Sequence, residues 1–253
     1  MPTNQEEFIA AAQALTKDGK YGLLESWDKA SHLQDNLNRW CLMFGGDFYD
    51  WTLDGTKEAI QFMYDLVHKY NVTSIDNLST DFETGNQKFA DGNAAMYFQW
   101  SAAASSFSEA GKYGDEIICA PMPTFKTNKT PMSSWMWVVN KNSAKKEAAK
   151  EYVKFMATPE AQAAYMKATG KFSPTANLSV WDDPELCKDL LTVEEHKSYV
   201  EADSFAARTL CPRHSEYMDT VTGTLQEYLM DEISFEECLE KGQQQIDELL
   251  NNG

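Results

Sequence analysis

The stretch from Phe89 to Trp100, with the sequence FADGNAAMYFQW, constrains the fold more than any other part of the chain. Phe89 closes an amphipathic run, and residues 91–93 tolerate the positive φ angles at which helices stop. Residues 94–98 form an apolar run of strand length. The sequence therefore predicts a helix end, a turn and a buried strand that delivers Trp100 at its carboxyl end. Ligand crevices form at that edge of open α/β sheets, so Trp100 is either a core residue, which its residue type favours, or a platform for a ligand.

Short apolar runs alternate with helical periodicity along the rest of the chain. We expect helices at 3–18, 27–43, 55–70, 102–110, 144–156, 159–169, 196–206, 214–230 and 234–250, with a further short one that ends at Gly92. We expect strands at 21–24, 94–98, 117–120 and 135–139, an aromatic-rich turn at 45–51 and an extended segment at 172–175. Short strands separated by helices are typical of an α/β fold.

Several helix starts carry capping residues. The segments TNQE at 3–6 and SFEE at 234–237 match the capping box, in which a hydroxyl and a carboxylate satisfy the first backbone N–H groups. Thr158 is a further N-cap, followed by Pro159 at the first helical position, where its missing N–H does no harm. In the last helix one face is expected to be buried, comprising Phe235, Cys238, Gly242, Ile246 and Leu249.

Composition and charge exclude several classes of protein. The chain has 253 residues, enough for one large or two small domains, and it lacks a run of the roughly 20 apolar residues that a membrane span needs. It carries 39 Asp plus Glu against 22 Lys plus Arg, and this net charge of −17 disfavours nucleic acid and anionic lipid surfaces as partners. The five scattered cysteines fit small buried hydrophobes, with one disulfide pair left open as an alternative.

Five motifs occur in an order that resembles one family of proteins. They are FADGNAAM at 89–96 followed by Trp100, APMP at 120–123, SWMWVVNK at 134–141, AKEYVKFMATPEAQ at 149–162 and QQQIDELL at 243–250. The first is similar to the Phe-x-x-Gly-x-Ala-Ala-Met of that family, whereas the Gly-Gly that usually precedes its aromatic strand is replaced by serines at 133–134. The chain resembles the C-terminal two thirds of a family 1 extracellular solute-binding protein of an ABC importer, the group that includes maltodextrin-binding protein.

The resemblance implies a periplasmic-binding-protein-like α/β fold of type II, in which two lobes hold a solute between them. It assigns 1–137 and 186–253 to the C-terminal lobe, whereas 138–185 would pack on an N-terminal lobe of which only a remnant is expected here. A bare helix face costs several kcal/mol at roughly 25 cal/mol per Å², so repacking, dimerisation or strand exchange is expected of such a truncated fragment. The intact protein is expected to be a membrane-anchored lipoprotein outside the cell or a periplasmic protein, with an ABC permease as partner. The first residues of this chain carry no signal segment.

The resemblance also implies capture of an oligosaccharide or another small solute, without catalysis and without a cofactor or metal. Sugars present flat apolar faces rimmed with hydroxyl groups, which aromatic rings and polar side chains recognise. The candidate ligand-binding residues are Trp100, Trp40, Gly46, Asp47, Trp135, Tyr217 and Glu216. Core packing is an equal alternative for Trp40 and Trp135, and Trp51 and Trp181 are expected to be packing residues.

Two other classes of function stay open at the level of sequence. A carbohydrate-active enzyme of the glycosidase type needs paired carboxylates, and most acidic pairs of this chain, such as the one at 194–195, stand at expected helix starts. The sequence has no nucleophile elbow, phosphate loop or His-Glu-x-x-His motif. The segment CPRH at 211–214 offers only two zinc ligands or a single Cys–His pair, which is weak support for either chemistry. A protein-interaction module also fits the acidic surface.

Overall fold

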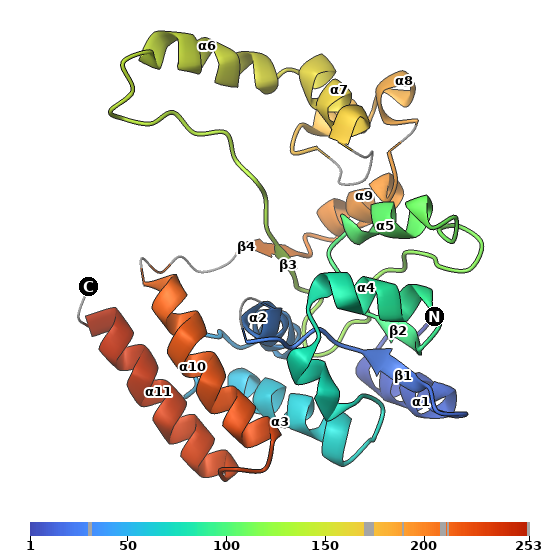
Figure 1. Ribbon diagram of the computed structural model, residues 1–253, viewed down its shortest axis with the longest axis vertical. Coiled ribbons are helices and arrows are strands. Elements are labelled where there is room, and N and C mark those ends of the chain that lie inside the picture. Colours follow the sequence, from blue (N-terminus) through green and yellow to red (C-terminus); the bar gives the residue numbers. More distant parts are fainter. Residues whose placement is uncertain (30–31, 170–174, 189, 208–210, 212, 252–253) are drawn as a thin grey trace. The chain divides into compact units, whose positions relative to one another are not determined.

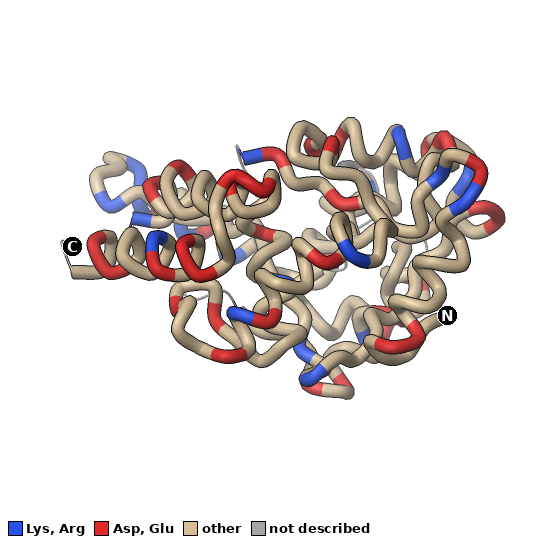
Figure 2. The backbone as a smooth tube through the Cα atoms, turned by 90° about the horizontal axis from the view of Figure 1, so that it is seen from below, with Lys and Arg blue, Asp and Glu red and all other residues tan. Residues whose placement is uncertain are grey.

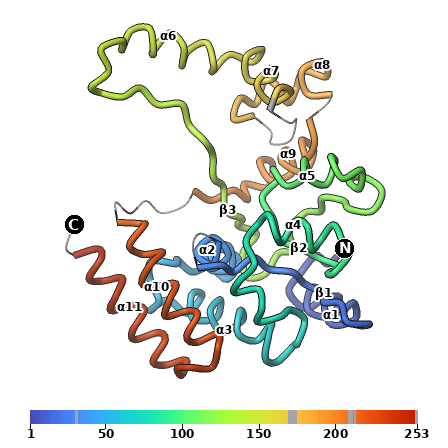
Figure 3. The backbone as a smooth tube through the Cα atoms, viewed as in Figure 1, coloured from blue at the N-terminus to red at the C-terminus, as the bar shows by residue number. Residues whose placement is uncertain are grey.

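The computed structural model describes residues 1–29, 32–169, 175–188, 190–207, 211 and 213–251. The chain divides into two compact units, and Figures 1 and 3 trace it through both. The first unit comprises Met1–Gln99, Pro121–Met132 and Asp203–Gly253, and the second comprises Trp100–Ala120 and Ser133–Ala202. These boundaries differ from the expected lobe boundaries, because the second unit also takes in residues 100–120 and extends to residue 202. The assignment of residues to lobes of an intact protein stays a prediction.

The first unit contains all strands of the described chain, and helices of this unit pack against two short parallel pairs. Its elements are α1 (Gln5–Leu15), β1 (Tyr21–Leu24), α2 (His32–Phe44), α3 (Asp54–His68), η1 (Ile75–Ser79), α4 (Phe82–Ala90), β2 (Ala94–Tyr97), β3 (Thr130–Met132), β4 (Phe205–Ala207), α10 (His214–Leu229) and α11 (Phe235–Asn251). β1 pairs with β2 and β3 with β4, both in parallel. The regular elements described in the second unit are all helices: α5 (Ala103–Glu109), α6 (Lys146–Met156), α7 (Pro159–Thr169), η2 (Leu178–Val180), α8 (Pro184–Cys187) and α9 (Val193–Glu201).

The segment that leads into β2 folds largely as predicted. α4 ends where expected, and Gly92 adopts a φ of 73° while its N–H donates to the carbonyl of Phe89 at 2.9 Å. The strand that follows is only half-buried, and Ala95 within it is exposed, so the prediction of a buried strand is wrong. The reason is that β2 belongs to a sheet of two strands and lacks neighbours on its other side among the described residues.

An aromatic core holds the first unit together. Trp40 on α2 is fully buried, and its ring centroid lies 4.9 Å from that of Phe62, 5.3 Å from that of Phe98 and 5.6 Å from that of Phe125. α2 packs against α3, and α10 against α11. Burial of these faces supplies the main stabilisation of the unit, since apolar area removed from water is the dominant favourable term in folding.

The last helix buries the predicted face except for Phe235, which is half-buried at the start of the helix. Cys238, Gly242, Ile246 and Leu249 are buried in α11, and the expected cap is confirmed by the N–H of Glu237, which donates to Ser234 Oγ at 3.1 Å. A β-carbon on Gly242 would lie 2.2 Å from the ring of Trp51. The glycine therefore permits the close approach of α11 to the 45–51 turn.

The cap of the first helix is shifted by one residue from the prediction. The side chain of Asn4, rather than Thr3, accepts the N–H of Glu7 at 3.0 Å. The Glu7 carboxylate in turn accepts the N–H and the hydroxyl of Thr3, both at 2.8 Å. The capping-box logic holds with Asn4 and Glu7, because an amide oxygen caps as well as a hydroxyl does. The predicted cap at Thr158 is confirmed, since its hydroxyl accepts the N–H of Ala161 at 3.3 Å.

Several expected elements differ in the structure. Residues 118–120 and 133–140 form no strand, and no described strand pairs with them. A strand needs a neighbour that satisfies its backbone groups, which an apolar run alone does not supply. The helix expected to start at Trp27 starts at His32, and the one expected at 196–206 lies at 193–201, with β4 after it. The segment 170–174, which includes most of the expected extended stretch, lies outside the described residues.

The second unit has a small buried cluster of its own. It consists of Ala163, Val180, Trp181, Leu190 and Val193. The expected packing role of Trp181 is thus confirmed, as is that of Trp51, which is buried in the first unit. At the surface, the ring of Trp137 lies 5.6 Å from that of Tyr152 and 5.9 Å from that of Tyr165. Acidic residues recur along most helices of both units, as Figure 2 shows, and no helix among the described residues is long and apolar enough to cross a membrane.

Candidate ligand-binding site

The carboxyl ends of β1 and β2 lie side by side, because Leu24 is opposite Tyr97 in the parallel register. We name the carboxyl edge the last residue of each strand and the residues that directly follow it, 24–28 and 97–99, together with the side chains that contact them. In open α/β sheets the crevices that bind ligands lie outside such an edge. The stretch of sequence that ends in Trp100 runs through this edge.

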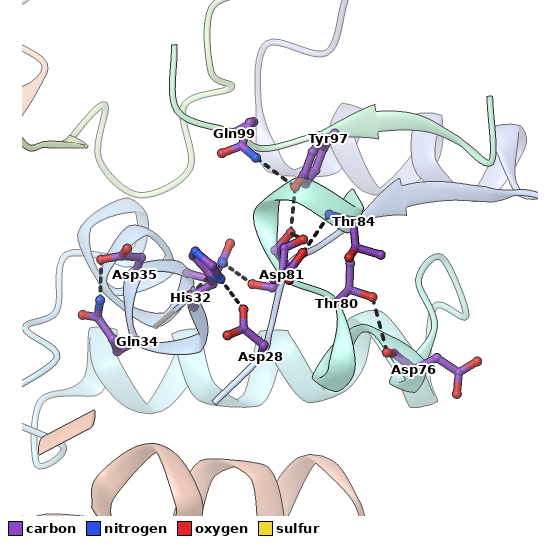
Figure 4. A network of polar contacts seen from close by, with 12 residues as sticks. Asp28, His32, Gln34, Asp35, Asp76, Thr80, Asp81, Thr84, Tyr97 and Gln99 are labelled. Carbon is purple, nitrogen blue, oxygen red and sulfur yellow. Dashed lines mark hydrogen bonds and ion pairs between the residues drawn. The ribbon is translucent and has the colours of Figure 1, made fainter. Parts of the chain in front are cut away.

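A chain of uncharged polar groups crosses the carboxyl edge (Figure 4). Nε2 of Gln99 donates to the Tyr97 hydroxyl and to Oδ1 of Asn86, both at 2.9 Å. The hydroxyls of Tyr97 and Ser26 are 2.7 Å apart, and Ser26 Oγ donates to the carbonyl of Asp81 at 3.1 Å. Since Ser26 gives its proton to Asp81, Tyr97 donates to Ser26, and the donors run in one direction. Burial raises the pKa of Tyr97 to about 12, so its hydroxyl stays protonated at neutral pH.

A buried ion pair lies next to this chain. Glu25 directly follows β1 and is fully buried, and its carboxylate oxygens accept Nη2 of Arg39 at 2.7 and 2.8 Å. The guanidinium carbon lies 4.3 Å from the ring centroid of Phe98 and 4.7 Å from that of Trp40. Burial raises the pKa of Glu25, and the Arg39 charge opposes that rise. Because Glu25 is closed off from solvent, the pair serves the structure of the edge rather than direct contact with a ligand.

His32 lies between two carboxylates at the same edge, as Figure 4 shows. Its Nδ1 pairs with Asp28, and its ring centroid lies 3.7 Å from that of Phe82. The pKa of Asp81 is lowered, chiefly by hydrogen bonds from the backbone and side chain of Thr84 and in smaller part by His32. The side chains of His32 and Asp28 are 18% and 17% exposed, so this part of the edge stays in contact with solvent.

Comparison with known proteins supplies the family. Residues 2–163 match the bacterial extracellular solute-binding proteins. The chain belongs to this family. The solved structure of maltose-bound MalE3 from T. maritima matches it with a TM-score of 0.78 at 22% identity, over 99% of this chain and 66% of that one. The solute-binding protein of an ABC transporter from Agrobacterium radiobacter K84, in complex with ribitol, gives a TM-score of 0.80 at 18% identity, over 98% of this chain and 65% of that one.

One curated relative is named for another class of solute. The probable amino-acid ABC transporter periplasmic-binding protein y4oP of Sinorhizobium fredii (strain NBRC 101917 / NGR234) is 25% identical over 197 residues, which are 74% of this chain and 43% of the relative. The chain therefore spans less than half of that relative and less than two thirds of the two solved ones. The predicted family and the type II periplasmic-binding-protein fold are confirmed.

Two of the candidate ligand-binding residues lie in the core of the first unit. Trp40 is fully buried, so of its two alternatives the structure favours core packing. Tyr217 on α10 is also fully buried, and its hydroxyl donates to the carbonyl of Phe48 at 2.5 Å. Burial raises the pKa of Tyr217 well above its ordinary value. Neither ring offers a face to a ligand.

Three other candidates of the first unit reach solvent. Gly46 and Asp47 are half-buried beside the start of α3, where the Thr56 hydroxyl donates to the carbonyl of Asp47 at 2.9 Å. A β-carbon on Gly46 would lie 2.4 Å from the backbone nitrogen of Thr56, so this contact requires glycine. Glu216 is exposed and accepts Nε of Arg213 at 2.8 Å, a hydrogen bond that lowers the pKa of Glu216. The hydrogen bond from the Tyr217 hydroxyl to the carbonyl of Phe48 holds the 45–51 turn next to α10.

The remaining candidates lie in the second unit. Trp100 is half-buried, and its carbonyl accepts the N–H of Ala103 at 2.9 Å at the start of α5. Trp135 is fully exposed in the segment that was expected to be a strand. Trp135 is therefore not a core residue of the second unit, so the packing alternative for it is wrong. Trp100 keeps part of its surface open to solvent.

Sequence reasoning missed the polar groups of the carboxyl edge. Tyr97 and Gln99 lie two positions apart in extended chain, and that spacing on one face was the available signal. No signal in the sequence indicated Ser26 and Asn86. These residues contact Tyr97 and Gln99 only because β1 pairs with β2 and α4 packs beside β2.

The described residues give no support to metal or thiol chemistry. They contain no group of three or more His, Cys, Asp or Glu side chains that could hold a metal ion. His214, half of the weak zinc or nucleophile motif, has its Nδ1 2.7 Å from the hydroxyl of Tyr49. All five cysteines are free thiols, which decides the open question of a disulfide pair. Burial raises the pKa of Cys238 to about 12 and that of Cys119 to about 11, so neither is an activated nucleophile.

Proposed function

We propose that this chain binds a neutral, hydroxyl-rich solute, in particular an oligosaccharide, for import by an ABC transporter. Aromatic stacking and polar hydrogen bonds hold the ligand in a cleft between the two lobes of the intact protein. The observation that carries the proposal is the carboxyl edge, where uncharged groups of Gln99, Tyr97 and Ser26 line up and the charge of Glu25 is balanced by Arg39. The half-buried side chains of Gln99 and Tyr97 supply uncharged donors and acceptors that match sugar hydroxyls, whereas the almost fully buried Ser26 holds Tyr97 in place.

The ligands of solved relatives support a neutral solute. Maltose is bound in the T. maritima protein, maltotriose in the Bdellovibrio bacteriovorus protein, ribitol in the Agrobacterium radiobacter protein and cycloalternan in the Listeria monocytogenes protein. The net charge of −17 disfavours an anionic ligand. An amino acid is the second candidate, because the name of the curated relative points to that class.

In this proposal the stacking surfaces are Trp100 and Trp135, since both have exposed area. Gly46, Asp47 and Glu216 supply backbone and carboxylate groups for hydrogen bonds to hydroxyls. Carboxylates accept strongly from neutral hydroxyl donors, so an acidic residue in such a site does not conflict with an uncharged ligand.

The rest of the intact protein is part of the proposal. We assign 1–137 and 186–253 to the C-terminal lobe and 138–185 to a segment that packs on the other lobe, with an ABC permease as partner. A lipoprotein anchor or a periplasmic location follows from the same assignment. The exposed run from Trp135 to Val138 favours dimerisation or strand exchange of the isolated chain. Light scattering that shows a compact monomer without dye-binding apolar surface would contradict that last part.

Calorimetry of a solute panel tests the function, on this chain and on the full-length gene product. The panel contains maltotriose, ribitol and a set of amino acids, and each carbohydrate sample is then assayed for newly formed reducing ends. We expect saturable binding of a neutral carbohydrate or polyol by the full-length product, without turnover. Binding of amino acids alone would favour the second candidate, release of reducing ends would favour the glycosidase-like alternative, and the absence of any binding by the full-length product would overturn the proposal.

A further inference from the structure

We propose that Tyr97 is a positioning residue for ligand capture, because its hydroxyl fixes the backbone that leads into Trp100. The inference rests on the proposed function, which assigns stacking of the solute to Trp100. Tyr97 ends β2, and the amide of Gln99 is held at 2.9 Å both by the Tyr97 hydroxyl and by Asn86. Gln99 and Trp100 share a peptide bond, so order at Gln99 restricts the dihedral angles through which the indole is presented.

The Tyr97 hydroxyl is itself anchored by two other elements. It lies 2.7 Å from Ser26, which follows β1, and Ser26 donates to the carbonyl of Asp81, the N-cap of α4. Ser26 is almost fully buried, so loss of its partner would leave a buried polar group with fewer hydrogen bonds. The Tyr97 oxygen therefore joins the ends of β1 and β2, and Ser26 extends the connection to the start of α4; Figure 4 shows the Tyr97 hydroxyl between Gln99 and Asp81.

Gly85 gives independent support for this role. It lies inside α4, where glycine weakens a helix. A β-carbon at this position would lie 2.3 Å from the Tyr97 hydroxyl oxygen and 2.7 Å from Ser26 Oγ. Glycine at this position thus allows α4 to approach the hydroxyl pair closely, and any larger residue would displace the hydroxyl on which Gln99 depends.

Tyr97→Phe tests the inference, since it removes the hydroxyl and keeps the ring. Tyr228→Phe is the matched control, because the Tyr228 hydroxyl also donates one hydrogen bond, to Gln61 at 3.1 Å, and lies outside the carboxyl edge. The first readout is amide hydrogen exchange of residues 98–101 in the solute-free full chain. We expect exchange about fivefold to tenfold faster in Tyr97→Phe and unchanged in Tyr228→Phe. Equal exchange in the two variants would overturn the inference.

Solute affinity is the second readout, and a merely structural role would not change it selectively. Tyr97→Phe should bind the tightest solute of the panel about tenfold more weakly, while its Tm shifts no more than that of Tyr228→Phe. Unchanged affinity would overturn the inference. If the wild-type protein binds no solute, the proposed function fails separately, and hydrogen exchange still decides whether Tyr97 orders this segment. Gly85→Ala should also speed up amide exchange of residues 98–101, because its β-carbon displaces the Tyr97 hydroxyl. If one of the two variants fails to fold, the other still tests the inference.

Discussion

The core of the first unit and the segment 135–155 of the second unit place their large aromatic side chains in opposite environments. Those of the first unit share nearly complete burial in one core: Trp27, Trp40, Trp51 and Tyr217. Those along residues 135–155 of the second unit share exposure: Trp135 fully, and Trp137, Tyr152 and Phe155 at 47%, 50% and 60%. Exposed apolar groups that gather in this way mark contact surfaces, whereas buried ones stabilise the fold. The contrast teaches that burial, rather than residue type, separates an aromatic that holds the protein together from one that can meet a partner.

The largest effect should come from the core of the first unit. Trp40→Ala removes a fully buried ring that contacts Phe62 and Phe98, and it should lower the free energy of unfolding by about 3–5 kcal/mol. Urea unfolding followed by circular dichroism measures this loss. Trp40→Phe is the control and should cost clearly less, since part of the ring contact remains. A loss below about 1 kcal/mol for the alanine variant would contradict the role of Trp40 in the core of the first unit.

A pair of helical glycines gives the next largest effect. Gly242→Ala places a β-carbon 2.2 Å from the ring of Trp51, so we expect a loss of about 1–3 kcal/mol despite the better helix propensity of alanine. Gly223→Ala on α10 meets only the flexible end of Lys29, with Nζ at 3.2 Å, and should be neutral or stabilising by up to about 1 kcal/mol. Thermal unfolding of both variants compares them, and equal losses would contradict the packing described for α11.

The next effect, smaller than that of Gly242→Ala, is a dependence of the free energy of unfolding on pH that comes from His196 in the second unit. Burial lowers the pKa of His196 from its ordinary value near 6.5. Above that pH the imidazole is neutral in both states; as the pH falls through 6.5 the unfolded chain takes up its proton first, so the free energy of unfolding decreases until the folded-state pKa is reached. Thermal melts at a pH above and a pH below this window should show the decrease, and His196→Gln should reduce it. An identical pH dependence in the variant would assign the effect to other groups.

The smallest effect on stability should come from the exposed run of the second unit. Trp135→Ser combined with Val138→Ser changes two strongly exposed side chains, so the free energy of unfolding should stay within about 0.5 kcal/mol of the wild type. Binding of an apolar dye and self-association should both decrease, because the surface that drives them is smaller. Unfolding and dye titrations on one preparation measure both quantities. A large loss of stability would mean that this run packs inside the unit and would remove the contrast between the two units.

Local signals predicted much of the fold. The helix stop at Gly92 and the buried face of α11 follow from residue patterns within one turn or one helix, and both are confirmed. The run at 135–139 shows the limit, because an apolar sequence becomes a strand only beside a partner strand. The candidate site was less predictable for the same reason. The hydrogen bond between Ser26 and Tyr97 joins residues 71 positions apart, a contact that only the assembled β1–β2 pair creates.

Residue type also could not separate the candidate tryptophans. Trp40 and Trp135 were equally balanced between packing and ligand contact in the sequence, and they lie at opposite extremes of exposure in the structure. Trp100 is intermediate, since it follows the carboxyl edge and keeps part of its surface open. It is therefore the residue on which the proposed function depends most.

The most direct test of that function is the calorimetric affinity of Trp100→Ala for the tightest-binding neutral solute, measured beside the wild-type full-length product. An indole that stacks on a sugar buries apolar area and adds a favourable ring contact, so its removal should weaken binding by about tenfold or more. We predict that loss for Trp100→Ala. An affinity equal to that of the wild type would contradict the assignment of Trp100 as the stacking residue and, with it, the proposed mode of solute capture.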